Sequence, residues 1–159
     1  MGLCGDLLNG RTVHSLLRLL IECGCQIVAI APDELAIPRE SLAKIPHAAD
    51  VVKVNPDLRA VLPELDVLYM TRVQRERFHD FDLYERFKKS YRLTREDLQA
   101  APASLRVLHP LPRVDEIATD TDSDPRALYF TQSANGVPVR MALLSAVLGL
   151  QNQVHGWVQ

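Results

Sequence analysis

An α/β fold is predicted by this sequence, in the form of a doubly wound parallel sheet of four to five strands with helices on both faces. Short apolar runs typical of buried strands alternate along the chain with segments of helical periodicity. No linker, repeat or low-complexity segment interrupts the 159 residues, which suffice for one domain that buries about two-thirds of its unfolded surface. We therefore expect a single Rossmann-like domain with right-handed crossovers.

The first predicted strand, helix and second strand follow one another directly. Gly2–Asp6 is a short apolar piece, and the turn signal Asn9-Gly10 comes after it. Gln26–Ala31 is a second buried strand, which Pro32 stops. Between the two, apolar residues fall at helical spacing and Gly24 can end the helix. These apolar residues are Val13, Leu16, Leu17, Leu20 and Ile21.

Two further strands flank a short helix in the middle of the chain. Asp50–Val54 is a weak third strand, and Asp57–Leu62 is predicted to be a helix closed by Pro63. Asp66–Thr71 has bulky apolar residues bounded by charge, as in a short buried strand.

The last part of the chain is predicted to contain one strand and three helices. His79–Leu93 mixes charged and aromatic residues without a clean period, which indicates a mobile, partly helical loop. Thr94–Ala100 begins with a capping signature. Leu105–His109 is the fifth strand, Asp124-Pro125 is a helix start, and Val137–Leu150 is a helix that is apolar on much of its circumference.

Composition excludes several classes of protein. A net charge of -2 argues against general nucleic-acid binding, and no apolar run approaches the roughly 20 residues of a membrane span. No basic segment of a signal peptide follows Met1. The cysteines, Cys4, Cys23 and Cys25, fit small buried hydrophobes in a reducing cytoplasm, and a lone C-x-C predicts no metal site.

Basic residues crowd the segment after the fourth predicted strand. Met70–Phe78 reads MTRVQRERF, and the carboxyl end of a strand in a parallel α/β sheet is where ligands bind. Arg72 and Gln74 are two residues apart, so on extended chain they point the same way. A guanidinium beside a carboxamide suits a carboxylate, although Arg-rich loops are often only solvated surface.

Two more strand-to-helix loops carry arginine. Arg11 stands at the head of the first helix, and Arg113 lies in His109–Ile117, HPLPRVDEI. In a parallel sheet all three loops open at one edge, so Arg11, Arg72 and Arg113 are expected to converge on an anion, most economically a dicarboxylate. No dinucleotide or P-loop glycine motif is present, and we expect no cofactor.

Four motifs together resemble the aspartate-binding half of the aspartate carbamoyltransferase family. They are GDLLNGRTVHSL, DVLYMTRVQRERF, HPLPRVDEI and DPRALYFTQSANGVPVRMALL, in the family's order and spacing. The resemblance runs from Gly2 to about Leu150, so residues 1–150 are expected to be the Asp/Orn-binding domain. Residues 151–159 form a tail that matches nothing.

The resemblance implies a role for each matching residue. Arg11 would bind the α-carboxylate side of L-aspartate, and Arg72 the β-carboxylate with Gln74 alongside. The carbonyl groups of Pro110 and Leu111 would face the attacking amine. Leu111-Pro112 would be cis, and Glu76–Phe87 would be the loop that moves on closure. His109, Pro112, Arg113 and Glu76 would support the site.

The resemblance also implies a partner domain. The family binds carbamoyl phosphate through an earlier domain with a Ser-Thr-Arg-Thr loop, and no S-T-R-T occurs in this sequence. We therefore expect carbamoyl phosphate to bind only through that N-terminal domain, the chain alone to be inactive, and carbamoyltransferase subunits to be partners. Leu8 and Asn9 depart from the family pattern and are not expected in the site.

Alternative interpretations remain open at this point. Ornithine carbamoyltransferase fits less well, because its substrate's ammonium calls for a carboxylate and its family has cysteine where this chain has Pro110. A non-catalytic module that binds a dicarboxylate or a subunit is a second reading. A structural role is favoured for His14 and His79, whereas His109 could be either structural or an acid–base group. Without a partner domain, Met141–Leu150 is expected to expose an apolar patch.

Overall fold

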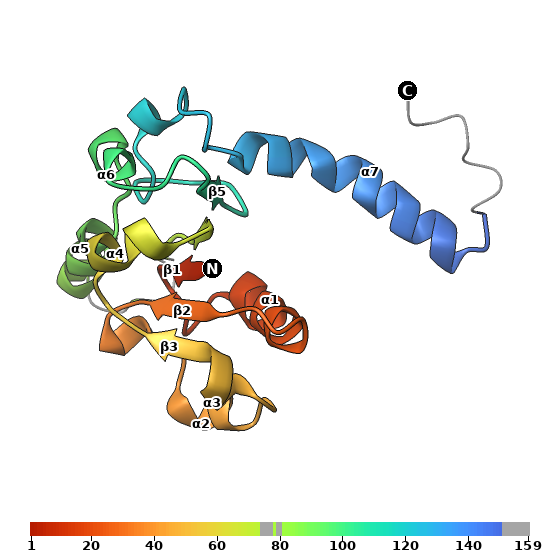
Figure 1. Ribbon diagram of the computed structural model, residues 1–159, viewed down its shortest axis with the longest axis horizontal. Helices are drawn as coiled ribbons and strands as arrows, with labels where there is room; N and C mark the ends of the chain where they lie inside the picture. Colours follow the sequence, from red (N-terminus) through yellow and green to blue (C-terminus); the bar gives the residue numbers. More distant parts are fainter. Residues whose placement is uncertain (74–77, 79–80, 151–159) are drawn as a thin grey trace.

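Five parallel strands form one sheet in the part of the chain that the structure describes, residues 1–73, 78 and 81–150 of this computed structural model (Figure 1). The strand order is β3-β2-β1-β4-β5. The predicted four to five strands are therefore confirmed. The strands are β1 (Gly2–Cys4), β2 (Ile27–Ile30), β3 (Val52–Val54), β4 (Val67–Met70) and β5 (Arg106–Leu108).

Helices connect the strands and cover the sheet. The α-helices are α1 (Arg11–Glu22), α2 (Arg39–Ala43), α3 (Ala48–Val51), α4 (Leu58–Val61), α5 (Phe81–Ser90), α6 (Arg95–Gln99) and α7 (Tyr129–Val147). Short 3-10 turns lie at η1 (Asp33–Leu35), η2 (Leu62–Glu64) and η4 (Thr119–Thr121). The helix predicted over Asp57–Leu62 is α4, which ends before Pro63 as expected, and the 3-10 turn η2 follows it.

Each face of the sheet has its own hydrophobic core. Side chains of a strand alternate between faces, so neighbouring residues enter different cores. In β1, Leu3 packs with the apolar side of α1, whereas Cys4 packs with α4 and α6. In β4, Tyr69 joins the first core and Leu68 the second. The sheet is therefore doubly wound, as the sequence predicts.

The order of the strands reverses between β1 and β4. The chain steps outward from β1 to β2 and β3, then returns to the other side of β1 for β4 and β5. Loops leaving β1 and β4 consequently part in opposite directions. In open α/β sheets this switch point is where ligands bind, beyond the carboxyl ends of the strands.

The helix predicted to start at Asp124-Pro125 is wrong. The Asp124 carboxylate accepts hydrogen bonds from the backbone N–H of Arg126, at 2.9 Å, and from its guanidinium. The backbone then pairs with β5: Val107 N–H donates to Arg126 O and Leu128 N–H donates to Val107 O. Because of this extended pairing, no helix begins at Asp124. The helix α7 begins at Tyr129, which is eight residues before Val137, where the apolar pattern predicted the final helix to start.

The segment predicted as a partly helical loop, His79–Leu93, contains the ten-residue helix α5, which is more helix than the weak periodicity suggested. Aromatic packing explains this difference. Phe78 packs its ring against those of Tyr84 and Phe87, which are buried. Tertiary contacts of this kind override weak local periodicity.

The final helix, α7, projects away from the sheet (Figure 1). Of its side chains only Tyr129, at its first residue, is buried. The expected exposure of apolar side chains within Met141–Leu150 is confirmed, and the exposed apolar residues begin earlier, at Val137. They are Val137, Val139, Met141, Leu143, Leu144, Val147, Leu148 and Leu150.

The three cysteines differ in their burial. The expectation of three buried cysteines holds for Cys4 alone, because Cys23 is exposed and Cys25 is half-buried. Burial raises the pKa of the Cys4 thiol well above its ordinary value, so it stays protonated. Among the described residues, no helix is both long and apolar enough to cross a membrane.

Candidate functional site

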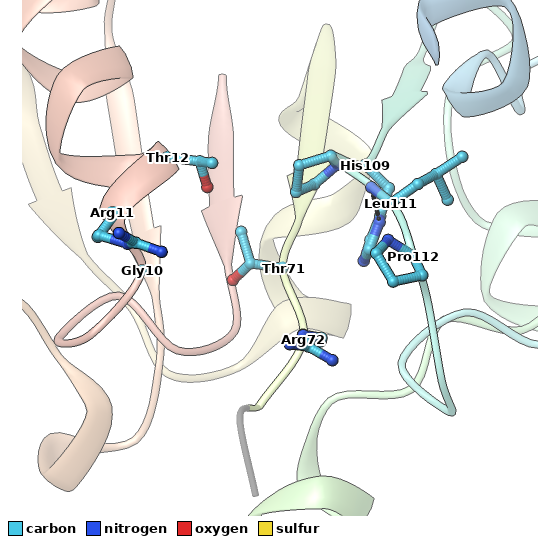
Figure 2. Close-up of a pocket in the computed structure, with 9 residues that line it drawn as sticks. Gly10, Arg11, Thr12, Thr71, Arg72, His109, Leu111 and Pro112 are labelled. Atoms are coloured by element: carbon cyan, nitrogen blue, oxygen red, sulfur yellow. Dashed lines mark hydrogen bonds between the residues drawn. The ribbon is translucent and has the colours of Figure 1, made fainter. Parts of the chain in front are cut away.

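A cavity of about 230 Å³ lies at the switch point of the sheet (Figure 2). Three loops line it: the one from β1 into α1, the one after β4, and the one after β5. Figure 2 shows Arg11 at the start of α1, Arg72 below the end of β4 and Leu111 on the far side. The lining residues are Gly10, Arg11, Thr12, Thr71, Arg72, His109, Pro110, Leu111 and Pro112.

Arg11 reaches the cavity because a compact turn precedes α1. Buried Asp6 accepts hydrogen bonds from the backbone N–H of Asn9, at 2.9 Å, and from its side-chain amide. A Cβ at Gly10 would lie 2.6 Å from Asp6 O, so glycine permits this close approach. The Arg11 guanidinium is exposed, and none of the described residues pairs with it. No side-chain hydrogen bond from Gly10 caps the start of α1, so this helix end and Arg11 together favour an anion.

Arg72 is positioned by contact between the ends of β1 and β4. The hydroxyl and backbone N–H of Thr71 both donate to Cys4 O, at 3.1 and 2.8 Å. Gly5 has φ +118, and a Cβ there would lie 2.2 Å from Thr71 O. Only glycine fits such a close approach. This contact brings the loops that carry Arg11 and Arg72 to adjacent strand ends. Gln74 and Glu76, predicted beside Arg72, lie outside the described residues.

The loop after β5 forms the opposite wall. The expected cis bond between Leu111 and Pro112 is confirmed. Leu111 has φ 46, in the left-handed region that residues other than glycine seldom adopt. His109 is 1% exposed, and its Nδ1 accepts a hydrogen bond of 2.8 Å from Leu111 N–H.

Arg113 does not join the other two arginines. It is not among the residues that line the cavity, and its guanidinium forms an ion pair with Asp122 and also donates to the hydroxyl of Tyr129. The guanidinium carbon lies 5.4 and 5.6 Å from the ring centres of Tyr129 and Phe130. Hydrogen bonding to Arg113 lowers the pKa of Asp122. The expected convergence of three arginines is therefore reduced to two.

Glu116 is a buried partner of the site that sequence reasoning missed. Its Oε1 lies 2.7 Å from His109 Nε2, and its Oε2 accepts from the backbone N–H groups of Val114 and Asp115. Burial alone would raise the pKa of Glu116, but these hydrogen bonds outweigh it and lower the pKa. No periodic or spacing signal marks Glu116 in the sequence. Thr12 and Thr71 were also missed, being ordinary residues next to predicted ones.

This arrangement can bind a small anion with two acidic groups. Guanidinium groups from two loops stand at one cavity, each able to make two charge-assisted bonds to a carboxylate. None of the residues lining the described cavity is acidic. Among the described residues, no cluster of His, Cys, Asp and Glu has the geometry to hold a metal ion.

Comparison with known sequences gives one consistent family. Residues 1–147 match the family described as aspartate/ornithine carbamoyltransferase, Asp/Orn binding domain. The aspartate carbamoyltransferase catalytic subunit of Bifidobacterium longum is 54% identical over 153 residues, covering 94% of this chain and 47% of that protein. The subunit of Methanopyrus kandleri is 51% identical over 150 residues, covering 94% and 48%.

Solved structures agree in fold. The catalytic subunit of M. jannaschii aspartate transcarbamoylase has a TM-score of 0.84 at 38% identity, covering 96% of this chain and 50% of that one. The Trypanosoma cruzi aspartate transcarbamoylase in complex with carbamoyl phosphate and aspartate has a TM-score of 0.80 at 36% identity, covering 90% and 48%. The chain thus spans about half the length of the relatives it matches.

Proposed function

We propose, from the premise that this chain belongs to the aspartate/ornithine carbamoyltransferase family, that it is the L-aspartate-binding half of an aspartate carbamoyltransferase. Residues 1–150 would be the Asp/Orn-binding domain and residues 151–159 a tail. The observation that carries the proposal is the cavity at the switch point, to which Arg11 and Arg72 contribute from different loops.

Binding of aspartate follows from the charges at this cavity. Arg11 would hold the α-carboxylate side and Arg72 the β-carboxylate, with Gln74 beside it. The carbonyl groups of Pro110 and Leu111 would accept hydrogen bonds from the amine. L-Ornithine is disfavoured, because its side-chain ammonium needs an acidic partner and the described lining has none.

The reaction proposed for the complete protein is transfer of a carbamoyl group. The aspartate amine attacks the carbamoyl carbon of carbamoyl phosphate, the C–N bond forms, and phosphate leaves with the electrons of the C–O bond. The amine loses a proton in the process. This chain would contribute positioning of the nucleophile, and positioning is a large share of catalysis in such reactions. The product would feed de novo pyrimidine biosynthesis.

The proposal includes partners and location. Carbamoyl phosphate would bind through an N-terminal domain, and further carbamoyltransferase subunits would associate with it. The free cysteines fit a reducing compartment, which supports the cytoplasm. The alternative is a non-catalytic module that binds a dicarboxylate or a subunit, and the exposed apolar residues of α7 are the observation that favours it.

Calorimetric titration of the chain with L-aspartate, succinate and L-ornithine tests the binding step. Heat with the first two ligands and none with the third is expected. Turnover is then measured after adding the carbamoyl-phosphate half of the Bifidobacterium longum subunit, fused or in trans. Carbamoyl-aspartate formed only with this half supports the proposal. Dicarboxylate binding without turnover in the fusion supports the non-catalytic module, and preference for ornithine contradicts the substrate assignment.

A further inference from the structure

The hydrogen bond from Leu111 N–H determines which ring nitrogen of His109 carries the proton in the buried pair of His109 and Glu116. Nδ1 of His109 accepts a hydrogen bond from Leu111 N–H, so this nitrogen carries no proton. The proton of the neutral ring is then on Nε2, which donates to Glu116 Oε1 at 2.7 Å. The side chains of His109 and Glu116 are 1% and 7% exposed, so water does not compete with either bond.

Glu116 uses its second oxygen to hold the other end of the same loop. Oε2 accepts from the N–H groups of Val114 and Asp115, both at 3.1 Å. All the groups that face the carboxylate are donors, so the ionised form satisfies every bond. One side chain therefore joins residue 109, where the loop leaves β5, to residues 114 and 115, where it ends.

Between these two anchors lies the segment that needs support. Leu111 has a left-handed backbone, which a residue with a Cβ adopts only where its surroundings impose it. Its N–H is held by His109 Nδ1, and its side chain packs against the buried core. Leu111 and Pro112 line the cavity, so the held conformation sets the shape of the cavity wall.

We propose that Glu116 is a positioning residue for aspartate: it fixes the tautomer of His109, and His109 in turn holds Leu111 in the conformation that shapes the binding cavity. This inference rests on the proposed function. Glu116 does not line the cavity, so it acts on the cavity wall through its hydrogen bonds with His109 and with the loop backbone. Aspartate binding then depends on which of the buried groups behind the cavity wall donate hydrogen bonds and which accept them.

Glu116→Gln is the sharpest variant because it keeps size and shape. A carboxamide has one acceptor and one donor, so it cannot accept from both His109 and the two backbone N–H groups. If its NH₂ faces Nε2, the ring must shift its proton to Nδ1, and Leu111 N–H loses its acceptor. If its NH₂ faces Val114 and Asp115, the far end of the loop is released.

A comparison variant separates positioning from general stability. Asp124→Asn makes the same carboxylate-to-amide change at an ion pair with Arg126 of similar burial, 11% exposed, away from the cavity. It should therefore lose stability while retaining affinity for aspartate.

The experiment measures L-aspartate dissociation constants, urea unfolding and the ¹⁵N signals of His109 in the chain. The unmodified chain should show protonated Nε2, and Glu116→Gln should lose this signature and bind aspartate about 10-fold more weakly or worse. Asp124→Asn should bind within about threefold of the unmodified chain despite lower stability.

Each result bears on a different statement. Unchanged affinity in folded Glu116→Gln, or affinity losses that track stability in both variants, would overturn the positioning role. Protonated Nδ1 in the unmodified chain would also overturn it. The unmodified chain could bind no aspartate while the tautomer of His109 still changes in Glu116→Gln as expected. In that case the proposed function fails and the control of the loop by Glu116 stands.

Discussion

Arg113 and Asp122 form an ion pair across nine residues, with both terminal nitrogens of the guanidinium donating to the two carboxylate oxygens. The same carboxylate accepts a hydrogen bond from the hydroxyl of Tyr129. Because Tyr129 is the first residue of α7 and is fully buried, this acidic group ties the loop after β5 to the helix that follows. A second ion pair, between Asp124 and Arg126, lies two residues further along.

These two carboxylates predict a loss of stability in acid. Hydrogen bonding to Arg126 holds the pKa of Asp124 at about 2, below its ordinary 3.8, and Arg113 lowers that of Asp122. A depressed pKa contributes stability that is complete above the unfolded value and disappears as pH falls through the folded one. Between about pH 4 and pH 2 the free energy of unfolding should fall by roughly 1–2 kcal/mol for Asp124 alone.

Urea unfolding of the chain and of Asp124→Asn across this range checks the prediction. The variant should be less stable near neutral pH and show a shallower decline in acid, because its amide does not titrate. Equal slopes for both proteins would contradict the assignment of this titration to Asp124.

Arg72→Ala should remove most affinity for aspartate. Arg72 is half-buried and lines the cavity, and loss of a charge-assisted contact there costs on the order of 2–5 kcal/mol. Arg72→Lys should recover little, since an ammonium cannot make the paired bonds. Calorimetry measures both, with Arg18→Ala as the control on an exposed face of α1 outside this cavity. An unchanged dissociation constant in Arg72→Ala would place the carboxylate elsewhere.

Thr94→Ala should destabilise the domain by about 1 kcal/mol. The Thr94 hydroxyl accepts from Asp97 N–H while the Asp97 carboxylate accepts from Thr94 N–H, so two backbone donors at the start of α6 are satisfied. Thr94→Ser keeps the cap and serves as the control. Chemical denaturation compares the two, and equal losses would mean that the methyl group, not the cap, matters.

The exposed apolar residues of α7 should make the chain self-associate or bind a hydrophobic dye. Leu144 is 63% exposed and Val147 is 83% exposed, within a run of apolar side chains on one helix. The double substitution Leu144→Glu with Val147→Glu should reduce dye fluorescence and leave aspartate affinity unchanged. Covering α7 with a fused carbamoyl-phosphate half should have the same effect. A chain that is monomeric and dye-silent at high concentration would contradict the prediction.

Sequence reasoning anticipated those parts of the fold that local patterns encode. Capping at Thr94, the strand at Asp66–Thr71 and the cis bond before Pro112, the last from the family resemblance, are all found in the structure. It failed where a distant partner decides. Asp124 resembles a helix cap, but pairing of the following backbone with β5 prevails. Arg113 was predicted to be a third ligand-binding arginine, but its guanidinium pairs with Asp122 instead.

The candidate site shows the same division between local and distant signals. Arg11 and Arg72 can be placed from sequence because parallel topology alone brings their loops to one edge. Glu116 cannot, because its importance arises only when the loop folds back on His109.

The buried thiol of Cys4 can be used to measure how often the sheet opens around β1. Its thiol lies in the central strand and is fully covered, whereas Cys23 is exposed at the end of α1. A thiol reagent should therefore label Cys23 at once and Cys4 only when β1 separates from its neighbours. The rate of the slow reaction measures how often the centre of the sheet opens, and a ligand bridging the loops after β1 and β4 should slow it.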